Sequence, residues 1–83
     1  MKLIYRARLQ SAFGRRLRKL RKSKGVTPSV FEAISGINVG NLAKYENGER
    51  EPGLVIIMIM AHALDLSHLD LLDFAFDPDA PID

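Results

Sequence analysis

The chain has 83 residues, no cysteine and a formal net charge of +2. Its length suffices for one domain, and the lack of cysteine excludes disulfides and thiolate-bound metals. A chain of this size buries only about 60% of its unfolded surface, which leaves a thin margin of stability. The longest apolar run, residues 54–61, is too short to cross a bilayer, and the first ten residues lack the features of a signal peptide. We therefore expect a cytoplasmic protein without membrane association.

Charge is distributed unevenly along the chain. Residues 1–24 hold ten of the twelve Lys and Arg residues and no acid, whereas residues 54–83 hold six Asp and no Lys or Arg. This asymmetry predicts that the first part attracts a polyanion, and it favours nucleic acid. A basic helix that is simply solvated would give the same distribution, so the charge alone leaves both interpretations open.

The first helix is predicted over residues 11–23. Phe13, Leu17 and Leu20 form an apolar stripe at helical spacing, while Arg and Lys residues fill the other face. Gly25 follows, and its residue type predicts the C-cap there. Residues 1–10 form either an arm or an extension of this helix, and the sequence leaves both open.

The next two helices have clear start signals. Thr27 is an N-cap residue followed by Pro28 at the first helical position, and this helix ends near residue 35, before Gly36. Asn38 caps a third helix, which stops at residues 47–48. The apolar residues of the second helix are Val30, Phe31 and Ile34. In the third helix, Leu42 and Tyr45 are expected to face inward.

The run LVIIMIMAHAL, residues 54–64, is ambiguous by itself because its β-branched residues also suit a buried strand. Its length, its Pro-Gly entry and the lack of a second strand candidate favour a fourth helix. We expect an inward face of Leu54, Ile57, Met58, Ala61 and Leu64. Ser67 then caps a short fifth helix, whose apolar residues are Leu69, Leu71 and Leu72.

The chain resembles the phage-repressor and Cro type of helix-turn-helix domain, the lambda-repressor-like family. Three segments carry the resemblance, in this order and at these separations: FGRRLRKLRKSKGVT, SGINVGNLAKYENGEREP and IMAHALDLSHLDLL. The resemblance implies a compact all-α domain of five helices over residues 11–73, with the helix-turn-helix at helices two and three. Residues 1–10 precede this domain, and residues 74–83 are expected to form an acidic, flexible tail.

The resemblance also implies which residues meet double-stranded DNA, because the third helix of such a motif enters the major groove. The implied base contacts are Val39, Gly40, Asn41 and Lys44. The implied phosphate contacts are Thr27, Ser29, Asn38, Asn47 and Arg50. Arg21 and Glu46 match a pair that forms an internal ion pair in this family, and we interpret them as structural.

Three residues depart from the family's pattern. Pro28 replaces the usual Gln and has no side-chain donor for a phosphate, a role that Thr27 and Ser29 are left to fill. Glu32 replaces a small residue between the two helices, so its carboxylate must reach solvent, find a cation or hold the helices apart. Gly40 removes a side chain from a reading position and costs about 1 kcal/mol of helix stability relative to Ala.

The fourth helix is also apolar on its outer side, which requires a second cover. We expect a homodimer interface made of Val55, Ile56, Ile59, Ala63, Leu69, Leu72 and Phe74. Two alternatives stay open: the N-terminal LIY segment folds over this face, or another protein binds there.

The sequence thus predicts a transcriptional regulator, a repressor by resemblance, that binds specific DNA sites as a dimer. The alternative is a protein-interaction module on the same fold, such as the antitoxin of a toxin–antitoxin pair. Catalysis has little support, since the two histidines, His62 and His68, lack the spacing of metal ligands and no nucleophile–base set is present. No cofactor or metal is predicted.

Overall fold

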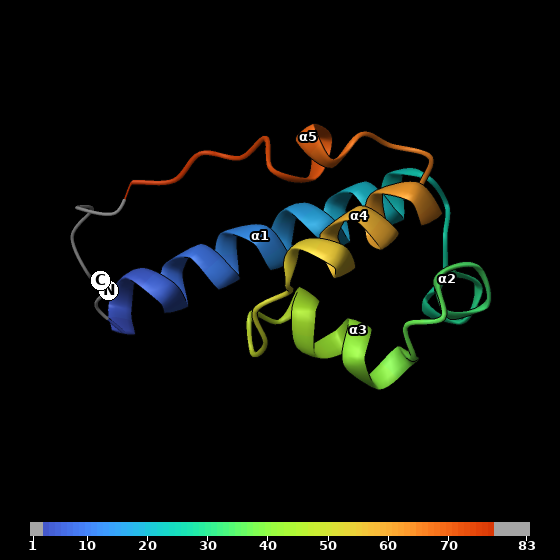
Figure 1. The fold of residues 1–83 in the computed structure, drawn as a ribbon, viewed down its shortest axis with the longest axis horizontal. Helices are drawn as coiled ribbons and strands as arrows, with labels where there is room; N and C mark the ends of the chain where they lie inside the picture. Colours follow the sequence, from blue (N-terminus) through green and yellow to red (C-terminus); the bar gives the residue numbers. More distant parts are fainter. Residues whose placement is uncertain (1–2, 78–83) are drawn as a thin grey trace.

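The computed structural model describes residues 3–77 and is all-helical over that range (Figure 1). Its elements are α1 (Leu3–Ser23), α2 (Pro28–Ser35), α3 (Val39–Glu46), α4 (Leu54–Ala63) and α5 (His68–Leu71). Helix α1 packs against α3 and α5, α2 packs against α3 and α4, and α4 also packs against α5. The predicted all-α class with five helices is confirmed.

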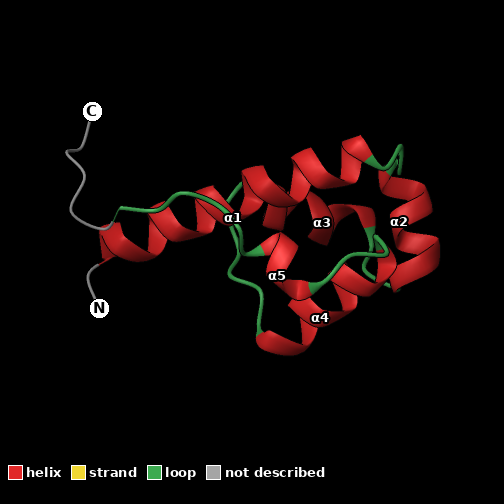
Figure 2. Ribbon diagram, turned by 90° about the horizontal axis from the view of Figure 1, so that it is seen from above, coloured by secondary structure: helices red, strands yellow, loops and turns green. Residues whose placement is uncertain are grey.

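Helix α1 begins earlier than predicted, at Leu3 rather than near residue 11, so the described part of residues 1–10 is a helix extension. Its first turns run past the other helices, and the segment after α5 lies alongside them (Figures 1 and 2). The rings of Tyr5 and Phe76 meet edge to face there, with centroids 5.3 Å apart. Of the predicted tail, residues 78–83 lie outside the described range, as do residues 1–2 of the predicted arm or extension.

Side-chain caps confirm the predicted starts of α2, α3 and α5. The hydroxyl of Thr27 accepts a hydrogen bond from the backbone N–H of Val30 before α2, which begins at Pro28. The side chain of Asn38 caps α3, and that of Ser67 caps α5. These caps occupy backbone donors that have no partner inside their own helix.

The core lies where the inner faces of the five helices meet. Its buried members are Phe13, Leu17, Phe31, Ile37, Leu42, Tyr45, Met60, Ala61, Leu64 and Leu71. Burying a large apolar side chain fully contributes about 1.5–3 kcal/mol. This set holds α3 with its Leu42 and Tyr45 inward, as predicted, and leaves its opposite side open.

The predicted rotation of α4 is wrong. Leu54 and Met58, expected to face inward, are exposed, whereas Ile56, expected on the outer face, packs against the core. On α2, Phe31 is buried while Val30 and Ile34 are exposed. Helix α4 is apolar on almost every side, so its sequence pattern contains no polar face that would fix its rotation. The buried Met60 and Ala61 show which side faces inward.

Candidate nucleic-acid interface

The turn between α2 and α3 fixes the direction of α3. Gly36 adopts a φ of 79°, a conformation that side-chain-bearing residues rarely take, and its N–H donates to the Glu32 carbonyl. The next residue, Ile37, is buried and its N–H donates to the Ser35 hydroxyl. The chain therefore reverses tightly and enters α3 against the core.

A buried ion pair ties α3 to α1. The guanidinium of Arg21, which is 6% exposed, donates from Nε and Nη2 to the two carboxylate oxygens of Glu46 at 2.6 and 3.0 Å. Its Nη1 donates to the Val26 carbonyl at 2.8 Å. The hydrogen bond to Glu46 raises the pKa of Arg21, while burial opposes the shift. The pair predicted as structural is present, and it fixes the last turn of α3.

The same two helices approach closely at Gly14. A Cβ at this position would lie 2.5 Å from the carbonyl oxygens of both Tyr45 and Glu46, so no larger residue fits without movement. The sequence prediction missed this role, because a glycine inside a helix by itself indicates only a weak position. Together with the ion pair, the contact sets how far α3 projects from the core.

The outer side of α3 carries the predicted reading residues. Val39, Gly40 and Lys44 are exposed, and Asn41 is partly exposed. The first turn of α3 offers few free polar groups. Gly40 has no side chain, and the side-chain oxygen of Asn38 already accepts a hydrogen bond from the Asn41 N–H at 2.7 Å. Lys44 is thus the one cation among the four reading residues.

The side chain of Glu32 caps the start of α3. Its carboxylate accepts a hydrogen bond from the backbone N–H of Val39 at 2.8 Å while the residue stays exposed. Of the three outcomes expected for this carboxylate, the structure shows that it reaches solvent, and it adds a cap that the sequence did not reveal. The bond joins residues seven apart across the turn, a spacing that no local capping rule covers. A negative charge therefore lies at the start of α3, the helix that is predicted to read bases.

A reading residue and a phosphate-contact candidate are joined directly. The Nη1 of Arg50 donates to the side-chain oxygen of Asn41 at 2.7 Å. The other phosphate candidates lie at element ends: Thr27 and Ser29 at the start of α2, Asn38 at the start of α3, and Asn47 after its end, all exposed. An exposed amide side chain thus lies at each end of α3, and Arg50 adds a cation beside Asn41.

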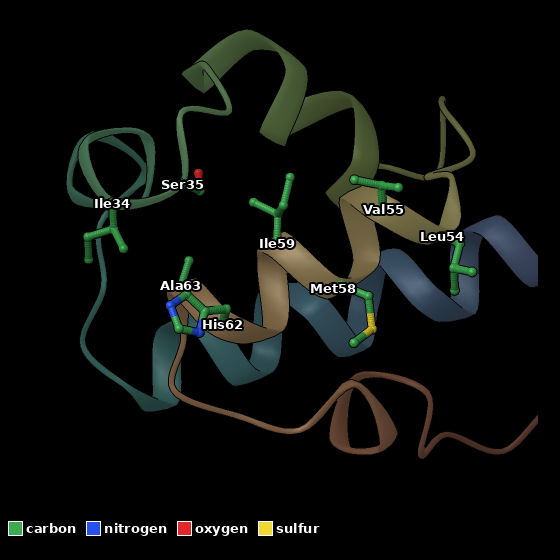
Figure 3. A pocket seen from close by; sticks show the side chains of 8 residues that line it. All are labelled: Ile34, Ser35, Leu54, Val55, Met58, Ile59, His62 and Ala63. Atoms are coloured by element: carbon green, nitrogen blue, oxygen red, sulfur yellow. The ribbon is translucent and has the colours of Figure 1, made fainter.

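The exposed surface of α4 is made of partly different residues from those predicted. Of the predicted interface residues, Val55, Leu69 and Leu72 are exposed, whereas Ile56, Ile59, Ala63 and Phe74 are partly buried against the core. Leu54 and Val55 are 75% and 70% exposed. A groove of about 440 Å³ separates α4 from the end of α2 (Figure 3), and it is lined by Ile34, Ser35, Leu54, Val55, Met58, Ile59, His62 and Ala63.

The N-terminal segment does not cover this groove in the part of the chain that the structure describes. Tyr5 packs on Phe76 instead, and α1 makes no close backbone approach to α4.

Within residues 3–77, no helix is long and apolar enough to cross a membrane, and no group of three or more His, Asp or Glu side chains is placed to hold a metal ion.

Comparisons with known proteins agree with this architecture. Residues 17–71 match the helix-turn-helix family model. The HTH-type transcriptional regulator YazB of Bacillus subtilis is 42% identical over 55 residues, which cover 66% of this chain and 80% of YazB. The HTH-type transcriptional regulator y4dJ of Sinorhizobium fredii is 33% identical over 64 residues, covering 77% of this chain and 83% of y4dJ.

Solved structures show the same likeness. The restriction-modification controller protein C.AhdI of Aeromonas hydrophila superposes with a TM-score of 0.72 at 35% identity, covering 75% of this chain and 94% of C.AhdI. The clp gene regulator ClgR of Corynebacterium glutamicum gives a TM-score of 0.74 at 34% identity, over 77% of this chain and 83% of that one. The chain therefore belongs to the helix-turn-helix family of DNA-binding transcriptional regulators.

Proposed function

We propose that this protein regulates transcription in the cytoplasm by binding a specific DNA site as a homodimer, with α3 in the major groove. The observation that carries the proposal is the exposed side of α3, held outward by the Arg21–Glu46 pair and the contact at Gly14. Lys44 is proposed to donate to guanine or to a phosphate, and Val39 to contact a thymine methyl group. Arg50, Thr27 and Ser29 are proposed to contact the backbone.

The bare first turn of α3 limits direct reading of bases. Gly40 offers no side chain, and the Glu32 carboxylate at the helix start repels phosphate. Part of the specificity is therefore proposed to come from the shape and deformability of the DNA.

The dimer is proposed to form through the outer face of α4 together with α5. The exposed apolar residues there are Leu54, Val55, Met58, Leu69 and Leu72. A second copy that covers them would offset part of the small stability margin of this chain. It would also place two α3 helices for half-sites one helical turn of DNA apart.

The test is selection of binding sites from random duplexes, followed by affinity measurement at several salt concentrations. We expect a selected site to bind at least about a hundredfold more tightly than random DNA. Replacing Lys44 by Ala should reduce that preference, whereas replacing Lys24, which lies outside the interface, should leave it unchanged. Equal affinity for selected and random DNA would defeat the proposal. A reporter gene placed behind the selected site tests whether binding represses transcription.

A second candidate is an antitoxin whose α4 face meets a different protein. The antitoxin PezA of Streptococcus pneumoniae is 30% identical over 59 residues, covering 71% of this chain and 37% of PezA. The exposed apolar face of α4 fits a second copy or a different protein, and sedimentation of the purified chain distinguishes the two proposals. A dimer at micromolar concentration supports the first proposal, whereas a monomer that gains a stable complex only with a co-encoded protein supports the second.

A further inference from the structure

The outer face of α1 carries cations that the candidate interface does not use. Four of them are exposed and form what we call the basic flank: Arg15, Arg18, Lys19 and Lys22. With about 3.6 residues per turn, they fall within an arc of about 100° on one side of the helix. No acidic residue lies on α1, and no ion pair within residues 3–77 engages any of the four.

The basic flank points away from the core, since the buried Phe13 and Leu17 lie on the opposite side of the helix. It borders the contact with α3, because Gly14 of the same helix touches the end of α3. Figure 2 shows α1 and α4 on opposite sides of the molecule. In a dimer joined through α4, the basic flank therefore lies at the outer end of each protomer.

The neighbouring charges do not cancel this surface. Arg15, Arg16 and Lys19 line a hollow of about 310 Å³ beside the segment that follows α5, and Asp73 is the only acidic residue that lines it. Arg16 is held there by a hydrogen bond from its Nε to the Asp70 carbonyl at 2.9 Å. A row of cations with spacing fixed by a helix matches the repeating negative charge of a phosphate backbone and reads no bases.

We propose that the basic flank binds the phosphate backbone of the duplex beyond the sequence that α3 reads, and that the DNA bends toward α1 on both sides of the site. The proposal rests on the proposed function, because the flank lies beside a duplex only if α3 occupies its groove. Release of counterions from the added phosphate contacts favours the bend, and its elastic cost opposes it. The protein would thus recognise more duplex than its reading helices span.

The experiment compares two duplexes that share one selected site, a short one ending at the site and a long one with ten added base pairs on each side. For the wild type, the long duplex should bind on the order of tenfold more tightly at low salt. The slope of log affinity against log salt should be steeper by about 1 for each added phosphate contact. The variant R15Q/R18Q/K19Q/K22Q should lose this gain and bind the short duplex as the wild type does.

Controls keep the result specific. All four positions are exposed, so the variant should keep its melting temperature; if it does not, the pairs R15Q/K19Q and R18Q/K22Q replace it. K24Q removes one exposed cation outside the flank and is the control for the loss of a positive charge elsewhere on the surface. Equal wild-type affinity for both lengths, or a loss of equal size on both lengths in the variant, would overturn the proposal. Equal affinity of the wild type for short duplexes with the selected site and with random sequence would instead overturn the proposed function.

Discussion

The contact between α1 and α3 and the outer face of α4 are built in opposite ways. At the first, backbones touch at Gly14, and both charges of the Arg21–Glu46 pair are buried and hydrogen-bonded. At the second, Leu54, Val55 and Met58 present apolar surface to solvent, where each Å² left uncovered forgoes about 25 cal/mol. The difference indicates that contacts inside one chain orient α3, whereas the described part of the chain leaves the α4 face uncovered, which is why we propose a second copy there.

Removing one charge of the buried Arg21–Glu46 pair at the contact between α1 and α3 should cause the largest loss of stability. Glu46→Ala leaves the Arg21 guanidinium buried without its partner, which costs about 3–5 kcal/mol. Urea denaturation followed by circular dichroism measures this loss. Glu49→Ala, at an exposed position near the end of the same helix, should change stability by less than about 0.5 kcal/mol. Similar small losses in both variants would contradict a structural role for the pair.

Two glycine substitutions separate close packing from helix propensity. Gly14→Ala places its Cβ 2.5 Å from two carbonyl oxygens of α3 and should destabilise the fold by about 1–3 kcal/mol. At Gly40 the added Cβ meets only the Asn38 side chain, at 3.5 Å, so Gly40→Ala should stabilise α3 by about 0.5–1 kcal/mol. Melting temperatures measure both effects, and one that stays unchanged or rises in Gly14→Ala would show that the contact at Gly14 is not tight.

A charge on the outer face of α4 tests the second region. Val55→Asp should leave the stability of the monomer nearly unchanged, because Val55 is exposed there. It should raise the dimer dissociation constant at least about tenfold, equivalent to 1.4 kcal/mol. Sedimentation equilibrium measures this constant. Ala7→Asp puts the same charge on an exposed position of α1 and should leave it unchanged; a shift of equal size there would rule out a specific α4 interface.

The smallest expected effect concerns the charge at the tip of α3. Glu32→Gln retains an oxygen that can accept from the Val39 N–H but removes the carboxylate charge. DNA affinity should rise several-fold at low salt and approach the wild-type value as salt is raised, because exposed charges are screened. Fluorescence anisotropy over a salt series checks this. Unchanged affinity at low salt would mean that the tip of α3 stays away from phosphates.

Features that depend on neighbouring residues could be predicted from the sequence. Thr27, Asn38 and Ser67 cap the helices where their types and positions indicated, and Pro28 begins α2. The Arg21–Glu46 pair followed from resemblance. Whether residues 1–10 form an arm or extend the first helix stayed open because the apolar stripe begins only at Phe13, although no Gly or Pro in residues 3–12 would end a helix.

Features that depend on distant segments could not be predicted in the same way. The need for Gly14 arises from the backbone of α3, more than thirty residues away, and the Glu32 cap requires the turn to be folded first. The rotation of α4 was wrong at Leu54, Ile56 and Met58, because a helix that is apolar all round carries no periodic signal. In each case the deciding contact is tertiary.

The hydrogen bond between Arg50 and Asn41 also bears on the entropy of recognition. A free Arg side chain loses roughly 1.5–2 kcal/mol of rotamer entropy when it is fixed. In the proposed complex, part of that loss is already incurred in the unbound protein, so less would remain to oppose association. The bond also occupies a lone pair of the Asn41 oxygen and leaves its amide group free to donate, which favours acceptors such as guanine N7, adenine N7 or phosphate.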